Sequence, residues 1–215
     1  MLIFRAGLVL LATISVTLST TAAQAQLVAP LTTSDGKIAC TQGITGVGRI
    51  AQWEAVQDPV ALGGWALSET GGDATDLHFP LCISAQTVAR DVDATLRFKA
   101  VGGRASRAAG LVLRAQSAND YYVVRADALE GKVQLYRMQR GRRALIKSQD
   151  DVDVASDVWH ALRVILKGSS FEVSLDDKPV FKATDASLPM AGTVGVWSQA
   201  DSLIRFGSLL VAPVP

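Results

Sequence analysis

The chain has 215 residues and a formal net charge of +1, and 19% of its residues are charged. This balance argues against a dedicated polyanion binder, and the length suits one well-buried domain better than two. Helical periodicity is almost absent. Apolar and polar residues instead alternate along most of the chain, which predicts half-buried β-strands.

Residues 1–25 are interpreted as a signal peptide that is cleaved on export. Arg5 supplies a positive start, the apolar stretch after it is too short to span a bilayer, and Ala23-Gln24-Ala25 places small residues where a signal peptidase reads them. An N-terminal membrane anchor is the alternative, but Ser and Thr residues follow the apolar stretch directly. The sequence therefore predicts a periplasmic or secreted protein without a stable membrane anchor after cleavage.

Two cysteines, Cys40 and Cys82, remain after residue 25. In an oxidising compartment an even pair predicts one disulfide, whereas a cysteine-based metal site would need a closer pair such as Cys-x-x-Cys. The glycine-rich residues 26–64 show little periodicity. We expect an N-terminal strand and an irregular segment there, wrapped around residues 65–215 as part of the same domain.

Three stretches carry the clearest period of two. Residues 92–100 (VDATLRFKA), 159–168 (WHALRVILKG) and 171–183 (FEVSLDDKPVFKA) alternate apolar with polar positions, and the last turns back at Asp176–Lys178. Turn signals separate such stretches by roughly 8–12 residues, a spacing typical of an all-β sandwich or barrel. We therefore predict two stacked antiparallel sheets with apolar side chains between them.

The stretch 117–127, SANDYYVVRAD, divides its side chains between two faces. Tyr122 and Val124 are expected to join Leu111 and Leu113 in the core, because alternate residues of a strand share a face. The opposite face would then carry Arg114, Tyr121, Arg125 and Asp127.

Five elements resemble one group of folds. They are the strand 110–114 (GLVLR), Asn119–Tyr122 at the start of the next strand, Trp159–His160 opening a strand, the hairpin Leu175–Lys178, and Gly195-Val196-Trp197. They make residues 65–213 similar to the concanavalin A-like lectin/glucanase jelly roll, and more closely to laminin-G-like bacterial exported proteins of the family-16-glycosidase-like and 3-keto-disaccharide-hydrolase-like groups. The resemblance implies an all-β, two-sheet antiparallel jelly-roll β-sandwich, a fold shared by lectins, hydrolases and adhesion modules.

The chain departs from the catalytic members of this group. Retaining glycosidases of this fold need Glu-x-Asp-x-Glu on one strand, and none of the four glutamates begins that motif. Its closest counterpart, Glu172–Asp176 (EVSLD), is interpreted as a half-solvated strand that ends in a turn. The usual Phe-Asp-Asp-Leu reads Phe-Gly-Ser-Leu at 206–209, and the strand 121–125 lacks the glutamate of the keto-disaccharide hydrolases. No catalytic residue is therefore predicted.

Other polar residues have a structural and a functional interpretation. Asp150, Asp151, Asp153 and Asp157 could bind calcium, but this loop lacks the Asp or Asn and the Gly that an EF-hand-type loop needs at its fifth and sixth positions. We expect a solvated acidic loop, no metal site and no cofactor. Of the two histidines, the one beside Trp159 is interpreted as a packed strand residue rather than a catalyst.

Residues 137–143, RMQRGRR, hold four arginines. They could bind acidic glycans or nucleic acid, but a hairpin tip around Gly141 explains the same residues. Because an exported protein is not expected to meet nucleic acid, we interpret the stretch as a solvated turn.

The predicted ligand-binding residues are Arg114, Tyr121, Arg125, Asp127 and Trp197. The resemblance places sugars on such a curved face, where an aromatic ring stacks on the apolar side of a pyranose while Arg and Asp hydrogen-bond its hydroxyls. The alternative is a solvated face on which Arg125 pairs with Asp127 or Asp201. An open groove with an upright aromatic ring would favour ligand binding, and arginines held flat in ion pairs would favour the alternative.

The leading functional hypothesis is therefore an exported protein that binds a carbohydrate or glycoconjugate without catalysis. Two alternatives stay open: a glycoside hydrolase-like enzyme acting on a di- or polysaccharide, and a structural or protein-interaction module of the cell envelope.

Overall fold

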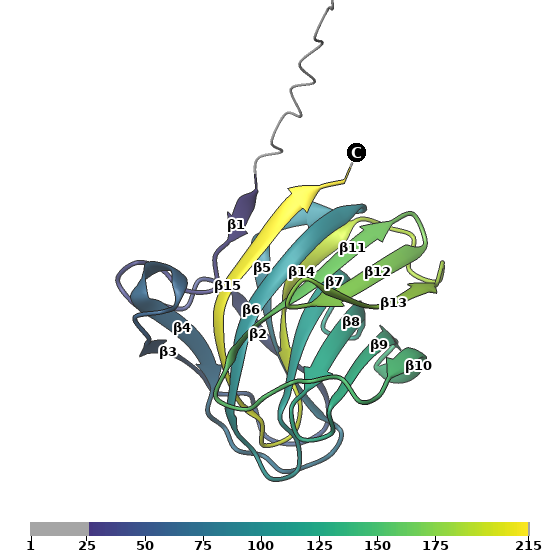
Figure 1. Ribbon diagram of the computed structural model, residues 1–215. Helices are drawn as coiled ribbons and strands as arrows, with labels where there is room; N and C mark the ends of the chain where they lie inside the picture. Colours follow the sequence, from purple (N-terminus) through teal and green to yellow (C-terminus); the bar gives the residue numbers. More distant parts are fainter. Residues whose placement is uncertain (1–25, 215) are drawn as a thin grey trace, which may run out of the picture.

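The computed structural model describes residues 26–214, which form two antiparallel sheets packed face to face (Figure 1). The predicted signal peptide lies outside the described residues. Within residues 26–214 the only helix is one short 3-10 turn, η1 (Leu62–Gly64). The prediction of an all-β, two-sheet jelly-roll sandwich is confirmed.

The two sheets contain strands from the whole described chain. The first has the order β13 (Lys178–Thr184), β12 (Ser170–Leu175), β11 (Trp159–Lys167), β6 (Val92–Gly102), β15 (Leu203–Pro213), β4 (Trp65–Glu69) and β3 (Trp53–Gln57), with β1 (Leu27–Ala29) paired to β15. The second has the order β10 (Arg142–Gln149), β9 (Lys132–Gln139), β8 (Asp120–Asp127), β7 (Ala108–Ser117), β14 (Gly192–Ser198), β5 (His78–Ala89) and β2 (Thr41–Gly46).

The core between the sheets follows the alternation of the sequence. On β6, β11 and β12 every second side chain is buried, and the residues between them face outward. Tyr122, Val124, Leu111 and Leu113 belong to the same apolar cluster, as predicted. Period two therefore identified correctly which side chains lie between the sheets.

The disulfide Cys40–Cys82 is present, with Sγ atoms 2.07 Å apart and Cα atoms 5.4 Å apart. It joins the residue before β2 to the middle of β5, the strand with which β2 pairs. A disulfide fits a protein that resides in an oxidising compartment. Residues 26–64 contribute β1, β2 and β3 to the two sheets, where the sequence indicated a single strand and irregular chain.

Two hairpin turns have positive φ at both turn residues, as tight two-residue turns need. Asp176 and Asp177 join β12 to β13 with φ values of 50° and 61°, and Arg140 and Gly141 join β9 to β10 with φ values of 51° and 73°. Two-residue turns with positive φ at both positions match the right-handed twist of the strands. Both predicted hairpins are confirmed.

The loop that follows β13 is fastened to the second sheet by Asp185. Its carboxylate accepts hydrogen bonds from the hydroxyl of Tyr122 (2.6 Å), from the backbone N–H of Ser187 (2.8 Å) and from Arg137 (2.8 Å). Burial alone would raise the pKa of Asp185, but the hydrogen bonds from Tyr122 and Ser187 and the charge of Arg137 lower it.

We expect Asp185→Asn to lower the free energy of unfolding by about 1–2 kcal/mol at pH 7, because charge-assisted hydrogen bonds are lost. A pKa that is lower in the folded protein stabilises it above the unfolded value of about 3.9, and this contribution is lost as the pH falls through the folded value. The difference between wild type and variant should therefore shrink below about pH 4. Urea unfolding between pH 7 and pH 2 measures it, with exposed Asp157→Asn as control; parallel curves for Asp185→Asn and wild type would contradict the assignment.

Over residues 26–214, no helix is both long enough and apolar enough to cross a bilayer.

Candidate functional site

Four of the five predicted ligand contacts lie on the outer face of the second sheet, but they are not open to solvent. Tyr121 and Trp197 have no exposed surface, and Arg125 and Asp127 expose 4% and 1%. A second apolar cluster surrounds the two aromatic rings. Trp197 stacks on Phe79 with ring centroids 5.3 Å apart. The expected open face is therefore filled by the protein's own side chains.

The second sheet curls so strongly that side chains from strands far apart in its order contact one another. The guanidinium of Arg143 on β10 lies 4.9 Å from the ring centroid of Phe79 on β5, although five strand steps separate these strands in the sheet. At about 4.8 Å per step, a flat sheet would hold them about 24 Å apart. Thr45 of β2 likewise shares a 2.8 Å hydrogen bond with the hydroxyl of Tyr121 on β8. Burial raises the pKa of Tyr121 to about 12.

Arg125 is held by neighbouring side chains on all sides. It donates to the amide oxygens of Gln134 (2.8 Å) and Gln199 (2.5 Å) and to Glu130 (3.1 Å), and it lies 3.4 Å from Asp127. This ion-paired arrangement is the one expected if the arginines have a structural role and do not bind a ligand. Ligand contact at Tyr121, Arg125, Asp127 and Trp197 stays a prediction, and it requires the side chains above them to move.

Arg114 does not share this face, and that part of the prediction is wrong. It has a φ of 49° at an irregularity in the β7–β8 pairing, which turns its side chain away from the outer face. The buried guanidinium donates to the backbone oxygens of Arg90 (2.7 Å), Leu188 (3.0 Å) and Gly168 (2.6 Å), and lies 3.3 Å from Asp91. Arg114 thus joins three loops, and ligand contact at this residue stays a prediction.

An open hollow lies instead at the edge of the sandwich where β10 and β13 run side by side (Figure 1). It has a volume of about 470 Å³ and is lined by the loop after β10 and by the β12–β13 hairpin. We call it the edge pocket. Its lining residues are Gln149, Asp150, Asp151, Val152, Asp153, His160, Leu175, Asp176, Lys178, Pro179 and Val180.

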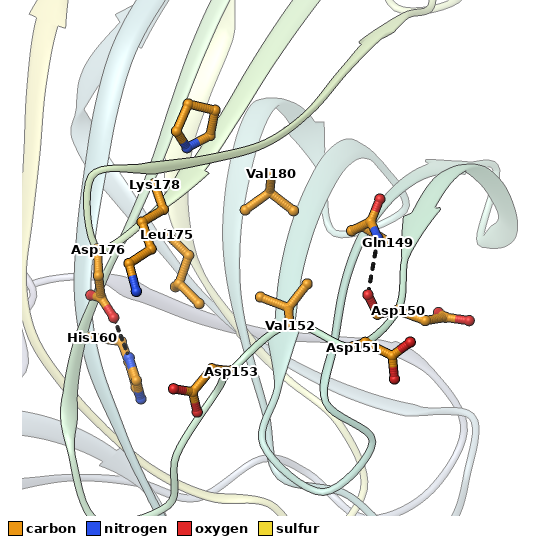
Figure 2. A pocket seen from close by; sticks show the side chains of 11 residues that line it. Gln149, Asp150, Asp151, Val152, Asp153, His160, Leu175, Asp176, Lys178 and Val180 are labelled. Atoms are coloured by element: carbon orange, nitrogen blue, oxygen red, sulfur yellow. Dashed lines mark hydrogen bonds and ion pairs between the residues drawn. The ribbon is translucent and has the colours of Figure 1, made fainter.

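One wall of the edge pocket is a hydrogen-bonded pair, His160 and Asp176 (Figure 2). The Nε2 of His160 donates to the backbone oxygen of Ala155 (3.0 Å), and its Nδ1 lies 2.6 Å from a carboxylate oxygen of Asp176. Because both neighbours are acceptors, both bonds form only when the ring carries two N–H groups. His160 is 5% exposed and packs on Phe98, so it is the packed strand residue that the sequence predicted.

Asp176 holds this wall because of its position in the hairpin turn. Its other carboxylate oxygen accepts the backbone N–H of Ala161 at 2.8 Å, which ties the β12–β13 turn to β11. Both oxygens of Asp176 are therefore occupied, and neither ring nitrogen of His160 is free to act as a base toward a ligand.

Three other charged side chains line the edge pocket: Lys178, Asp151 and Asp153. Among the described residues, none hydrogen-bonds to or forms an ion pair with the Lys178 ammonium or the carboxylates of Asp151 and Asp153. Figure 2 shows the apolar side chains of Val152 and Val180 between these groups. The pocket thus offers one free donor and two free acceptors beside an aliphatic surface, which suits a ligand that is both polar and apolar.

The acidic loop has no metal-binding arrangement in the described part of the chain. No group of three or more His, Cys, Asp or Glu side chains in residues 26–214 is placed to hold a metal ion. Asp150 instead accepts the hydroxyl of Ser148 at 3.2 Å and lies 3.9 Å from Lys132.

Sequence reasoning noted the acidic loop and the Asp176 turn but did not bring them together. It missed Lys178, Val180 and Gln149 as pocket residues. One feature of the sequence could have identified Lys178 as a pocket residue: it directly follows a two-residue turn, so its side chain extends from the end of the hairpin. Which loop faces that end is a tertiary property.

Comparisons with solved structures give the fold. The chain is similar to the carbohydrate binding module CBM66 from Bacillus subtilis, with a TM-score of 0.61 and 19% identity over 79% of this chain and 95% of that one. It is also similar to the exoplasmic/lumenal domain of VIP36 in its Ca²⁺/Man3GlcNAc-bound form (TM-score 0.55, 14% identity, 79% and 86% covered). A third likeness is the β-glucanase of Bacillus licheniformis (TM-score 0.50, 9% identity, 81% and 98% covered).

No protein-family model and no curated protein matches the sequence. At these identities the likenesses establish a concanavalin A-like, glucanase-like jelly roll.

Proposed function

We propose that this protein is an exported carbohydrate-binding protein that holds a neutral sugar in the edge pocket without hydrolysing it. The observation that carries the proposal is the pairing of unpartnered groups, the Lys178 ammonium and the Asp153 carboxylate, with an aliphatic surface in one hollow. Its volume of about 470 Å³ lies in the range of small-ligand sites.

The chemistry of a sugar matches this lining. Hydroxyl groups both donate and accept, so Asp151 and Asp153 would accept from them while Lys178 would donate to a hydroxyl or ring oxygen. The C–H face of a sugar ring would contact Val152 and Val180. The His160–Asp176 pair would act as a positioning wall, because its hydrogen bonds are already made within the protein.

The neighbours in structure support recognition of sugars and leave hydrolysis as the alternative. One is a carbohydrate binding module and one is a β-glucanase. Against hydrolysis stand the missing Glu-x-Asp-x-Glu motif and the engaged nitrogens of His160. Export, the absence of a cofactor and the absence of a nucleic-acid partner belong to the same proposal; the disulfide supports export.

Lys178→Ala and Asp153→Asn should each weaken binding of a neutral oligosaccharide about tenfold, since each removes a charge-assisted hydrogen bond of about 1.5 kcal/mol. Isothermal titration calorimetry with oligosaccharides selected on a glycan array measures this loss. Matched controls are Lys147→Ala on β10 and Asp157→Asn, two exposed residues outside the pocket. All four substitutions lie on the surface, so thermal unfolding should show little change.

Four results would contradict the proposal. Unchanged affinity in both pocket variants would show that the edge pocket is not the binding site. Loss of binding in Arg143→Ala alone would place the binding site on the filled outer face, which Arg143 covers. Shortened polysaccharide in the product mixture would favour the hydrolase. A silent glycan array would favour the protein-interaction module.

A further inference from the structure

The arginines of residues 137–143 point to two faces of the β9–β10 hairpin. Arg143 covers aromatic rings on the outer face. The pairing of β9 with β10 sets Arg137 opposite Ala144 and Gln139 opposite Arg142, and residues that oppose one another in an antiparallel pair share a face. The other face of the hairpin therefore carries Arg137, Gln139, Arg142 and Ala144.

These four residues and Arg140 line an open hollow of about 580 Å³, which we call the basic hollow. All the lining residues come from the hairpin. Two positions before Arg137 in β9, Leu135 on the same face is buried in the core. The small side chain of Ala144, opposite Arg137, leaves room between the guanidinium groups.

Positive charge in the basic hollow exceeds the negative charge beside it. Arg137 is fixed through one Nη atom, which donates to Asp185 (2.8 Å) and to the hydroxyl of Ser187. Among the described residues, no acceptor binds its Nε and its other Nη, and none binds the guanidinium groups of Arg140 and Arg142. A second carboxylate beside the hairpin tip, Asp120, accepts the backbone N–H of Arg140 (3.0 Å) and the hydroxyl of Ser117 (3.0 Å).

We propose that the basic hollow binds the oxyanions, carboxylate or sulfate, of an acidic polysaccharide. Guanidinium groups match both oxyanions through paired N–H donors, and three of them around one hollow can engage successive charged groups of a chain. Nucleic acid fits less well, because no aromatic residue lines the hollow for a base to stack on. The site differs from the edge pocket in every lining residue, so it does not rest on the function proposed there.

The test uses the double variant Arg140→Gln/Arg142→Gln, whose side chains lie at the exposed hairpin tip. The probes are polygalacturonate for carboxylate, chondroitin sulfate for sulfate, neutral dextran, and single-stranded DNA for phosphate. The matched control, Arg49→Gln/Arg104→Gln, removes the same charge from exposed residues at the opposite end of the second sheet. Affinity electrophoresis and calorimetry are run at about 50 and 200 mM salt.

We expect the hairpin double variant to bind at least one of the two acidic polysaccharides about tenfold more weakly than wild type. The control should bind as wild type does, and Lys178→Ala should keep this binding even where it loses neutral sugars. The polysaccharide that wild type prefers identifies the oxyanion. Equal loss in the control, no binding by wild type, equal binding of dextran, or tighter binding of DNA would each overturn the proposal.

Discussion

Replacing Arg114 with Met should lower the free energy of unfolding by about 4 kcal/mol. The change leaves three backbone oxygens and Asp91 without their shared donor at a site where Arg114 is only 1% exposed. Burial lowers the pKa of Arg114 and the charge of Asp91 raises it, which fits a cation held by its protein partners rather than by water. Urea unfolding followed by tryptophan fluorescence measures the change.

Two further variants complete the test: one separates the hydrogen bonds of Arg114 from its charge, and the other is a control at an exposed arginine. Arg114→Lys keeps the charge but cannot reach four acceptors from one ammonium, so most of the loss should remain. Arg104→Met removes an exposed arginine and should change stability by less than about 0.5 kcal/mol. An Arg114→Met protein within about 1 kcal/mol of wild type would show that the three loops are held together by other contacts.

Breaking the Cys40–Cys82 disulfide should cost about 4 kcal/mol, because the bond closes a loop between residues 42 positions apart and so restricts the unfolded chain. The loop contains β2, β3 and β4, which belong to both sheets. Breaking the bond should therefore lower the stability of the whole domain. Urea unfolding of the oxidised protein, the reduced protein and Cys40→Ala/Cys82→Ala measures it.

The reduced protein and the double variant should unfold at the same urea concentration, and reductant should not affect the variant. Hydrogen exchange should increase first in β2, an edge strand that keeps its pairing with β5 but loses its covalent attachment. Equal stability with and without reductant would contradict a role of the disulfide in stability.

The face with Tyr121 and Trp197 shows where sequence reasoning reached its limit. Alternation correctly separated Tyr121, Arg125 and Asp127 from the core residues Tyr122 and Val124. It assigned the first group to solvent because a sheet face away from the core is normally wet. The curl of the sheet brought Arg143 over that face and removed it from solvent.

The curl has an identifiable structural origin. Pairing in the second sheet is irregular between Leu113 and Ser117, between Thr193 and Gly195, and between Leu145 and Lys147. Bulges of this kind increase local twist and bend the strand. Gly110 permits the close packing inside the curl, since a Cβ there would lie 2.8 Å from Trp197 and Val123.

By itself the sequence determined the class of fold, the side chains between the sheets, the disulfide and the two tight hairpins. Each of these depends on local rules: strand alternation, turn backbone, and one possible pairing of two cysteines. Only the tertiary structure decided the filling of the outer face, the inward turn of Arg114 and the meeting of Lys178 with the acidic loop. The reason is that twist and bulges accumulate over the seven paired strands of the second sheet. Which distant loops lie next to one another therefore depends on the pairing of the whole sheet, and no short stretch of sequence contains that information.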